Sequence, residues 1–101
     1  MGLLSWLIRK GPVGNTAREI GDLYAQIRRE QPYSTPESTV REVAFRYGWA
    51  AATDETRLMG LVCTVIGRKT GKDPRMEAFQ DAEEIITDEL IKRGVPTKLI
   101  Q

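Results

Sequence analysis

Apolar side chains recur along this sequence at intervals of three and four residues, in four separate segments. Such spacing places them on one face of an α-helix. The four apolar faces begin at Ile20, Val40, Leu58 and Phe79. Because each helix would bury only that face, the four helices are expected to pack around one shared core. The sequence therefore predicts an all-α fold, a small bundle of four amphipathic helices.

Capping signals predict where the first two helices begin. Asn15 or Thr16 can cap the first helix, and Glu19, three residues after Thr16, would complete a capping box. Pro36 is expected at the first position of the second helix, where no N–H is required. Gly48 is placed to end that second helix.

Thr53 and the apolar pattern after it predict a third helix over residues 54–66. This segment is apolar on nearly all sides, which predicts the most buried element. Residues 61–66 also have the β-branched composition of a strand. We favour a helix because the sequence contains no second strand-like segment with which this one could pair.

The fourth helix is expected to begin at Asp73-Pro74, where proline follows a capping residue. Gly94, with Pro96 soon after it, is expected to end this helix. The predicted core face consists of Met76, Phe79, Ala82, Ile85, Ile86 and Leu90.

The length of the chain predicts a single domain. A chain of 101 residues can bury roughly 65% of its surface, which suffices for one core and not for two. We expect an apolar N-terminal helical segment at residues 1–10, the four-helix core at residues 15–94, and a tail at residues 95–101.

The composition excludes several classes of enzyme. The chain has no histidine and one cysteine, so histidine-dependent triads, histidine-containing metal sites and an intramolecular disulfide are excluded. Cys63 lies in an apolar run, where a buried thiol is unreactive. The carboxylates fall on polar helix faces or at caps, where nothing raises a pKa for acid catalysis. We expect a non-catalytic, cytoplasmic protein without a cofactor or a bound metal.

Residues 67–72 form a partial phosphate-binding motif. A P-loop has four residues between its glycines and a hydroxyl side chain after its lysine. Here three residues separate the glycines, and Asp73 stands in place of the hydroxyl. We expect a glycine that ends the third helix, followed by a basic turn that provides weak anion binding at most. The residues of this basic turn are Arg68, Lys69 and Lys72.

The segment Val40–Trp49 resembles the first helix and turn of a helix-turn-helix motif, with a small residue at Ala44 and a turn glycine at Gly48. The resemblance covers about ten residues and implies DNA binding. It fails beyond them, because Asp54 and Arg57 stand where a recognition helix would place apolar residues. The net charge of +1 is also small for a protein that must neutralise phosphates.

Four carboxylates are spaced so that they lie along one face of the fourth helix. They are Glu77, Asp81, Glu84 and Asp88. An amphipathic helix needs a polar face opposite its core face, so a solvated surface accounts for this acidic face. The alternative is that it contacts a basic surface of a partner.

The N-terminal segment contains five large apolar side chains within six residues, although chain termini are usually polar. These side chains, which we expect to contact a partner, are Leu3, Leu4, Trp6, Leu7 and Ile8. The bundle itself, another protein or a membrane interface could each receive them. We expect that the chain binds a protein partner or a second copy of itself. The alternatives are a degenerate helix-turn-helix protein that binds DNA and a peripheral membrane protein held by this segment.

Overall fold

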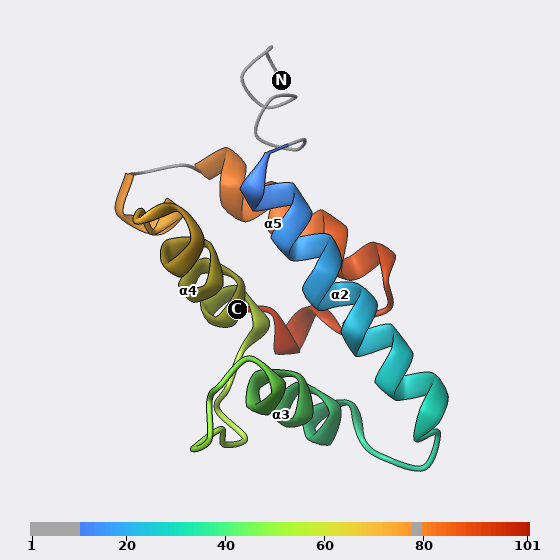
Figure 1. Cartoon of the computed structure of the whole chain (residues 1–101). Coiled ribbons are helices and arrows are strands. Elements are labelled where there is room, and N and C mark those ends of the chain that lie inside the picture. Colours follow the sequence, from blue (N-terminus) through green and yellow to red (C-terminus); the bar gives the residue numbers. More distant parts are fainter. Residues whose placement is uncertain (1–10, 78–79) are drawn as a thin grey trace.

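The computed structural model describes residues 11–77 and 80–101, with the side chains of residues 76–80 outside the description. The described residues form four α-helices and two short 3-10 helices, and they contain no strand (Figure 1). The predicted all-α fold is therefore confirmed. The elements are α2 (Pro12–Glu30), α3 (Pro36–Arg46), α4 (Leu58–Thr70), η1 (Pro74–Glu77), α5 (Gln80–Lys92) and η2 (Thr97–Leu99).

Helix α2 is the longest element and contacts each of the other three α-helices, most extensively α5. The two run side by side in the same direction (Figure 1). Their apolar faces meet those of α3 and α4 in one core. Side chains from all four helices that are fully buried in it include Ile20, Ile27, Val40, Val43, Leu58, Leu61, Val62, Ile86 and Leu90.

The first helix begins earlier than the capping signals predict. Helix α2 starts at Pro12, and the Asn15 N–H donates the first helical hydrogen bond to the Gly11 carbonyl at 3.0 Å. Proline at the first position needs no N–H partner and has its φ already set for a helix, so no side-chain cap is required. The predicted start at Asn15 or Thr16 is wrong, and Thr16 lies buried inside the helix.

The third helix is displaced from its predicted range. The structure confirms a helix, not a strand, over residues 61–66, but residues 54–57 are not helical. The Thr53 hydroxyl accepts a hydrogen bond from the Glu55 N–H at 3.2 Å, and the Thr53 N–H donates to the Thr56 hydroxyl at 3.0 Å. These bonds close a turn in place of a helix start, as threonine side chains often do. Helix α4 instead passes through Gly67 and ends at Gly71, whose φ is +79°.

Two predicted glycine ends are confirmed. Gly48 and Gly94 have φ angles of +95° and +90°, a conformation that glycine adopts without strain. After each glycine the next N–H bonds back into the last helical turn: Trp49 to the Ala44 carbonyl at 3.0 Å, and Val95 to the Leu90 carbonyl at 3.1 Å. This pattern is a Schellman motif, and it turns the chain sharply at the ends of α3 and α5.

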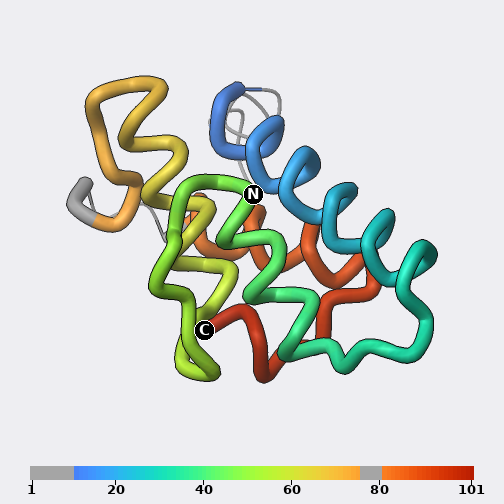
Figure 2. Tube along the Cα trace, turned by 60° about the horizontal axis from the view of Figure 1, so that its bottom comes forward, coloured from blue at the N-terminus to red at the C-terminus, as the bar shows by residue number. Residues whose placement is uncertain are grey.

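The C-terminal residues belong to the core, which corrects the prediction of a tail at residues 95–101. Val95, Leu99 and Ile100 are buried. The Ile100 carbonyl accepts a hydrogen bond from the Met59 N–H at 2.8 Å, beside the start of α4 (Figure 2). Amides in the first turn of a helix have no partner within the helix, so the C-terminal segment supplies a cap that α4 otherwise lacks.

The fourth helix is also shorter than predicted. The segment after Asp73 forms the 3-10 helix η1, and α5 covers Gln80–Lys92. Of the predicted core face, Ala82, Ile85, Ile86 and Leu90 are buried. The side chains of Met76 and Phe79 lie outside the described part of the chain.

Two helical glycines provide a test of the contact between α2 and α5. A Cβ atom at Gly21 would lie 2.6 Å from the Cδ atom of Arg93, whereas a Cβ at Gly67 would meet nothing closer than 4.0 Å. Gly21→Ala is therefore expected to lower the free energy of unfolding by about 1 kcal/mol, because Arg93 must leave its ion pairs. Gly67→Ala is the control, expected to raise it by about 0.5–1 kcal/mol through helix propensity. Urea denaturation measures both, and stabilisation by both substitutions would contradict the close approach.

Candidate functional site

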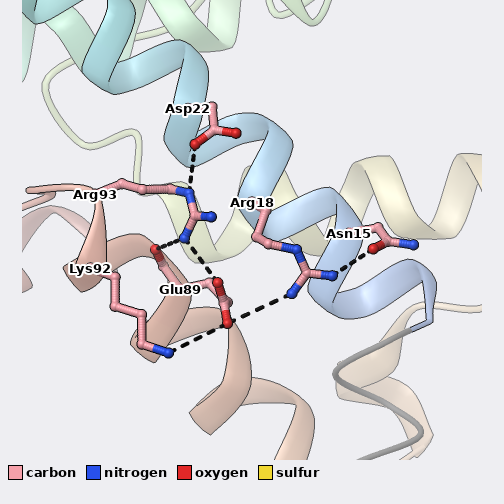
Figure 3. A network of polar contacts seen from close by, with 6 residues as sticks. All are labelled: Asn15, Arg18, Asp22, Glu89, Lys92 and Arg93. Carbon is pink, nitrogen blue, oxygen red and sulfur yellow. Dashed lines mark hydrogen bonds and ion pairs between the residues drawn. The ribbon is translucent and has the colours of Figure 1, made fainter.

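A network of charged side chains joins α2 to α5 (Figure 3). At its centre is Glu89, which is only 4% exposed. Its carboxylate accepts a hydrogen bond from Arg93 at 2.9 Å and lies 3.7 Å from the guanidinium of Arg18 and 3.8 Å from the ammonium of Lys92. Arg93 also bonds to Asp22 at 2.6 Å. Because the buried carboxylate is surrounded by cations, its charge is compensated, and the network fixes α5 along α2.

The predicted acidic face is only partly formed by exposed groups. Glu84 is exposed, Asp81 and Asp88 are half-buried, and the side chain of Glu77 lies outside the described residues. The sequence analysis did not select Glu89, although Glu89 is a buried carboxylate on this helix. The sequence does contain a signal for its burial. Glu89 follows Ile86 by three residues, so it lies on the same, apolar side of the helix.

Two of the three residues of the predicted basic turn are helical, which corrects that prediction. Arg68 and Lys69 lie in the last turn of α4, and Lys72 follows the helix. The guanidinium of Arg68 donates to the Tyr47 carbonyl at 3.0 Å. The ammonium of Lys69 lies 3.2 Å from the Glu19 carboxylate. Arg68 and Lys69 are thus engaged by the fold itself.

Glu19 also accepts a hydrogen bond from the Tyr47 hydroxyl at 2.8 Å. This bond and the neighbouring Lys69 lower the pKa of Glu19, while burial raises the pKa of Tyr47 above its usual value. The cluster joins α2, the end of α3 and the end of α4. It therefore acts as a structural contact between three helices.

A hollow lies at the loop between α3 and α4. It has a volume of about 750 Å³, and a second hollow of about 260 Å³ adjoins it. Trp49, Ala50 and Ala52 line both hollows. Beside them Phe45 is 61% exposed, which is rare for a phenylalanine. We define the Trp49 surface as Phe45, Trp49, Ala50, Ala51, Ala52 and Gly60.

Local bonds determine the shape of this loop. The glycine end of α3 directs Trp49 toward α4, where a Cβ atom at Gly60 would lie 4.0 Å from the Cη2 atom of the indole ring. Arg41 on α3 pairs with Asp54 in the loop. The guanidinium of Arg57 donates to the carbonyls of Asp54 and Thr56 at 2.7 and 3.0 Å. Most charged groups around the apolar residues are therefore already paired.

The geometry of the loop differs from that of a helix-turn-helix motif. Residues 47–57, eleven in all, separate α3 from α4, whereas the motif has a turn of three or four residues. The resemblance of Val40–Trp49 to that motif therefore ends with α3. The other predicted contact residues, Leu3, Leu4, Trp6, Leu7 and Ile8, lie outside the described residues.

Comparisons of the chain with protein-family models, with curated protein sequences and with solved structures gave no significant match. Within residues 11–77 and 80–101, no helix is long and apolar enough to cross a membrane. No group of three or more cysteine, aspartate or glutamate side chains in that part of the chain is placed to hold a metal ion.

Replacement of the buried carboxylate tests the network around Glu89. Glu89→Gln keeps the size of the side chain but removes the negative charge that the cations of the network surround, so we expect a loss of about 2 kcal/mol in the free energy of unfolding. The exposed Glu84 on the same helix is the matched control, and Glu84→Gln should change it by less than about 0.5 kcal/mol. Urea denaturation at low salt measures both variants, and equal effects would show that the network contributes nothing.

The single thiol provides a test by pH. Cys63 is buried, and burial raises its pKa to about 11. Since the thiolate is the reactive form and a buried sulfur is reached only when the structure opens, labelling of the native protein by a disulfide reagent should be at least about tenfold slower than labelling in urea at the same pH. In urea the same thiol should react quickly, with a rate that levels off near its ordinary pKa. Rapid labelling of the folded protein at neutral pH would contradict this burial.

Proposed function

We propose that this chain is a non-catalytic helical module that binds a protein partner, or a second copy of itself, through the Trp49 surface. The observation that carries the proposal is the exposed Phe45 beside a hollow with an apolar lining of tryptophan and small residues. Aromatic side chains next to a concave apolar surface are typical centres of protein interfaces.

Other exposed apolar residues are less suited to this role. Tyr33 projects from the loop between α2 and α3, and Ile91 is 47% exposed on α5. Neither lines a hollow at the Trp49 surface. Single exposed apolar residues are common on proteins and require no partner. The Trp49 surface differs because several apolar residues adjoin one another there.

Neither alternative function gains support from this loop. Asp54 and Glu55 would repel the phosphates of DNA. The charged groups beside the apolar residues are of mixed sign, whereas a membrane surface favours an excess of cations. The proposal includes a cytoplasmic location, which the single buried cysteine supports, because proteins of oxidising compartments commonly use disulfides. Imaging of a tagged chain would test that location.

A charge placed in the hollow tests the proposal. Ala51 is exposed, so Ala51→Arg should leave the fold intact while it blocks apolar contact. Ile91→Arg is the matched control, since it exchanges an exposed apolar residue for the same cation elsewhere. Immobilised wild-type protein and both variants are incubated with a lysate of the source cells, and the bound proteins are compared by mass spectrometry. Sedimentation measures self-association in parallel.

We expect Ala51→Arg to lose proteins, or self-association, that wild type and Ile91→Arg retain. Melting curves confirm that the variants are folded. Identical bound proteins and identical mass for the three chains would show that the Trp49 surface is not the contact.

A further inference from the structure

We propose that the Trp49 surface binds the same surface of a second copy of this chain, with Phe45 of each molecule inserted into the larger hollow of the other. The inference rests on the proposed function, since it names the partner of that surface. Each hollow is then completed by an aromatic ring that the second copy contributes.

The first argument is the arrangement of Phe45 and the two hollows. Phe45 lines the smaller hollow, which shares Trp49 and two alanines with the larger one. A projecting ring and a concave apolar lining therefore lie side by side on one surface. A twofold axis that passes between them, in the plane of the contact, brings each ring opposite the hollow of the other molecule. Twofold contacts of this reciprocal kind are the commonest between identical chains.

The ring of Phe45 is not covered by its own molecule. Helix α3 buries its opposite face in the core through Val40, Val43 and Ala44, so the position of Phe45 on the outer side is fixed. Although Phe45 lines the smaller hollow, it stays 61% exposed. A second molecule can cover this ring without any change in the fold.

The larger hollow has a suitable lining for a phenylalanine ring. Trp49 is half-buried and packs against the core, so the indole is held in place while it lines the hollow. Ala50 and Ala51 are exposed there and add small apolar groups. Contact between a phenylalanine ring and an indole is more favourable than burial of the same apolar area alone.

The second argument is charge complementarity. Glu55 and Arg57 both line the larger hollow, and within the described residues neither belongs to an ion pair. The guanidinium of Arg57 donates to two backbone carbonyls, which leaves its positive charge without a counter-charge. When two identical surfaces meet, the acid of each can face the base of the other. One acid and one base at the same hollow therefore match a second copy better than a strongly acidic or strongly basic partner.

The charged groups nearest Phe45 do not oppose such a contact. Arg41 is paired with Asp54, and Arg46 is paired with Glu42. Each pair is neutral as a whole, so two copies of this face bring no excess of one charge together. Repulsion between like charges, which usually prevents a surface from binding itself, is therefore small here.

Sedimentation equilibrium of the full chain over a concentration series tests this inference. Wild type should form a reversible dimer. Phe45→Ala removes the inserted ring and should raise the dissociation constant by about thirtyfold, and Ala51→Arg by a similar factor. Tyr33→Ala and Ile91→Arg are the matched controls, since they make comparable changes at exposed residues outside the Trp49 surface, and both should dimerise like wild type.

A mixture of the two weakened variants tests the reciprocal geometry. Phe45→Ala keeps an open hollow, whereas Ala51→Arg keeps the ring. A dimer of one with the other therefore retains one complete contact, and its blocked hollow faces the molecule that has no ring. The mixture should associate at least about fivefold more tightly than either variant alone. Sedimentation velocity with a fluorescent label on one variant measures this.

A wild-type chain that stays monomeric at every concentration would overturn the inference. A dimer that Phe45→Ala and Ala51→Arg leave unchanged, or a mixture that associates no better than its components, would do the same. The proposed function fails separately. If wild type is monomeric but Ala51→Arg still loses captured proteins, the Trp49 surface contacts a different protein.

Discussion

The packing of α2 against α3, α4 and α5 is the interaction on which the rest of the structure depends. Ile20 and Ile27 are fully buried and belong to the same core as the apolar faces of the other helices. Helices α3 and α5 each pack on α2 and on α4, and α2 is the more extensive contact of both. The Glu89 network fixes α5 along α2, since Arg18 of α2 faces Glu89 and Arg93, just after α5, pairs with Asp22 of α2.

The ends of the helices connect this core to the Trp49 surface. Gly48 turns the chain after α3 and starts the loop that forms the surface, and the start of α4 closes it. That start is held by the carbonyl of Ile100, which Gly94 and the buried C-terminal segment bring to Met59. The Trp49 surface therefore rests on residues from both halves of the chain, which gives it the fixed shape that recognition of a partner requires.

The charged side chains divide into those used by the fold and those left for contacts. Lys69 and Arg68, in the partial phosphate-binding motif, hold α4 against Glu19 and the Tyr47 carbonyl. Glu89 holds α5. By contrast, Glu55 at the edge of the larger hollow forms no ion pair within the described residues, and it lies beside the exposed Ala50 and Ala51. This difference is why the proposed function lies at the α3–α4 loop and not at the more highly charged segments.

The sequence by itself determined the all-α class, the buried apolar faces and the glycine ends at Gly48 and Gly94, because these follow from local periodicity and backbone conformation. Only the tertiary structure decided where α4 begins, that the last residues enter the core, and that Trp49 and Phe45 border an open hollow. Each of these depends on bonds between distant residues, such as Met59 with Ile100. Local sequence patterns cannot predict such contacts, because nearly every residue has the same backbone amide and carbonyl that form them.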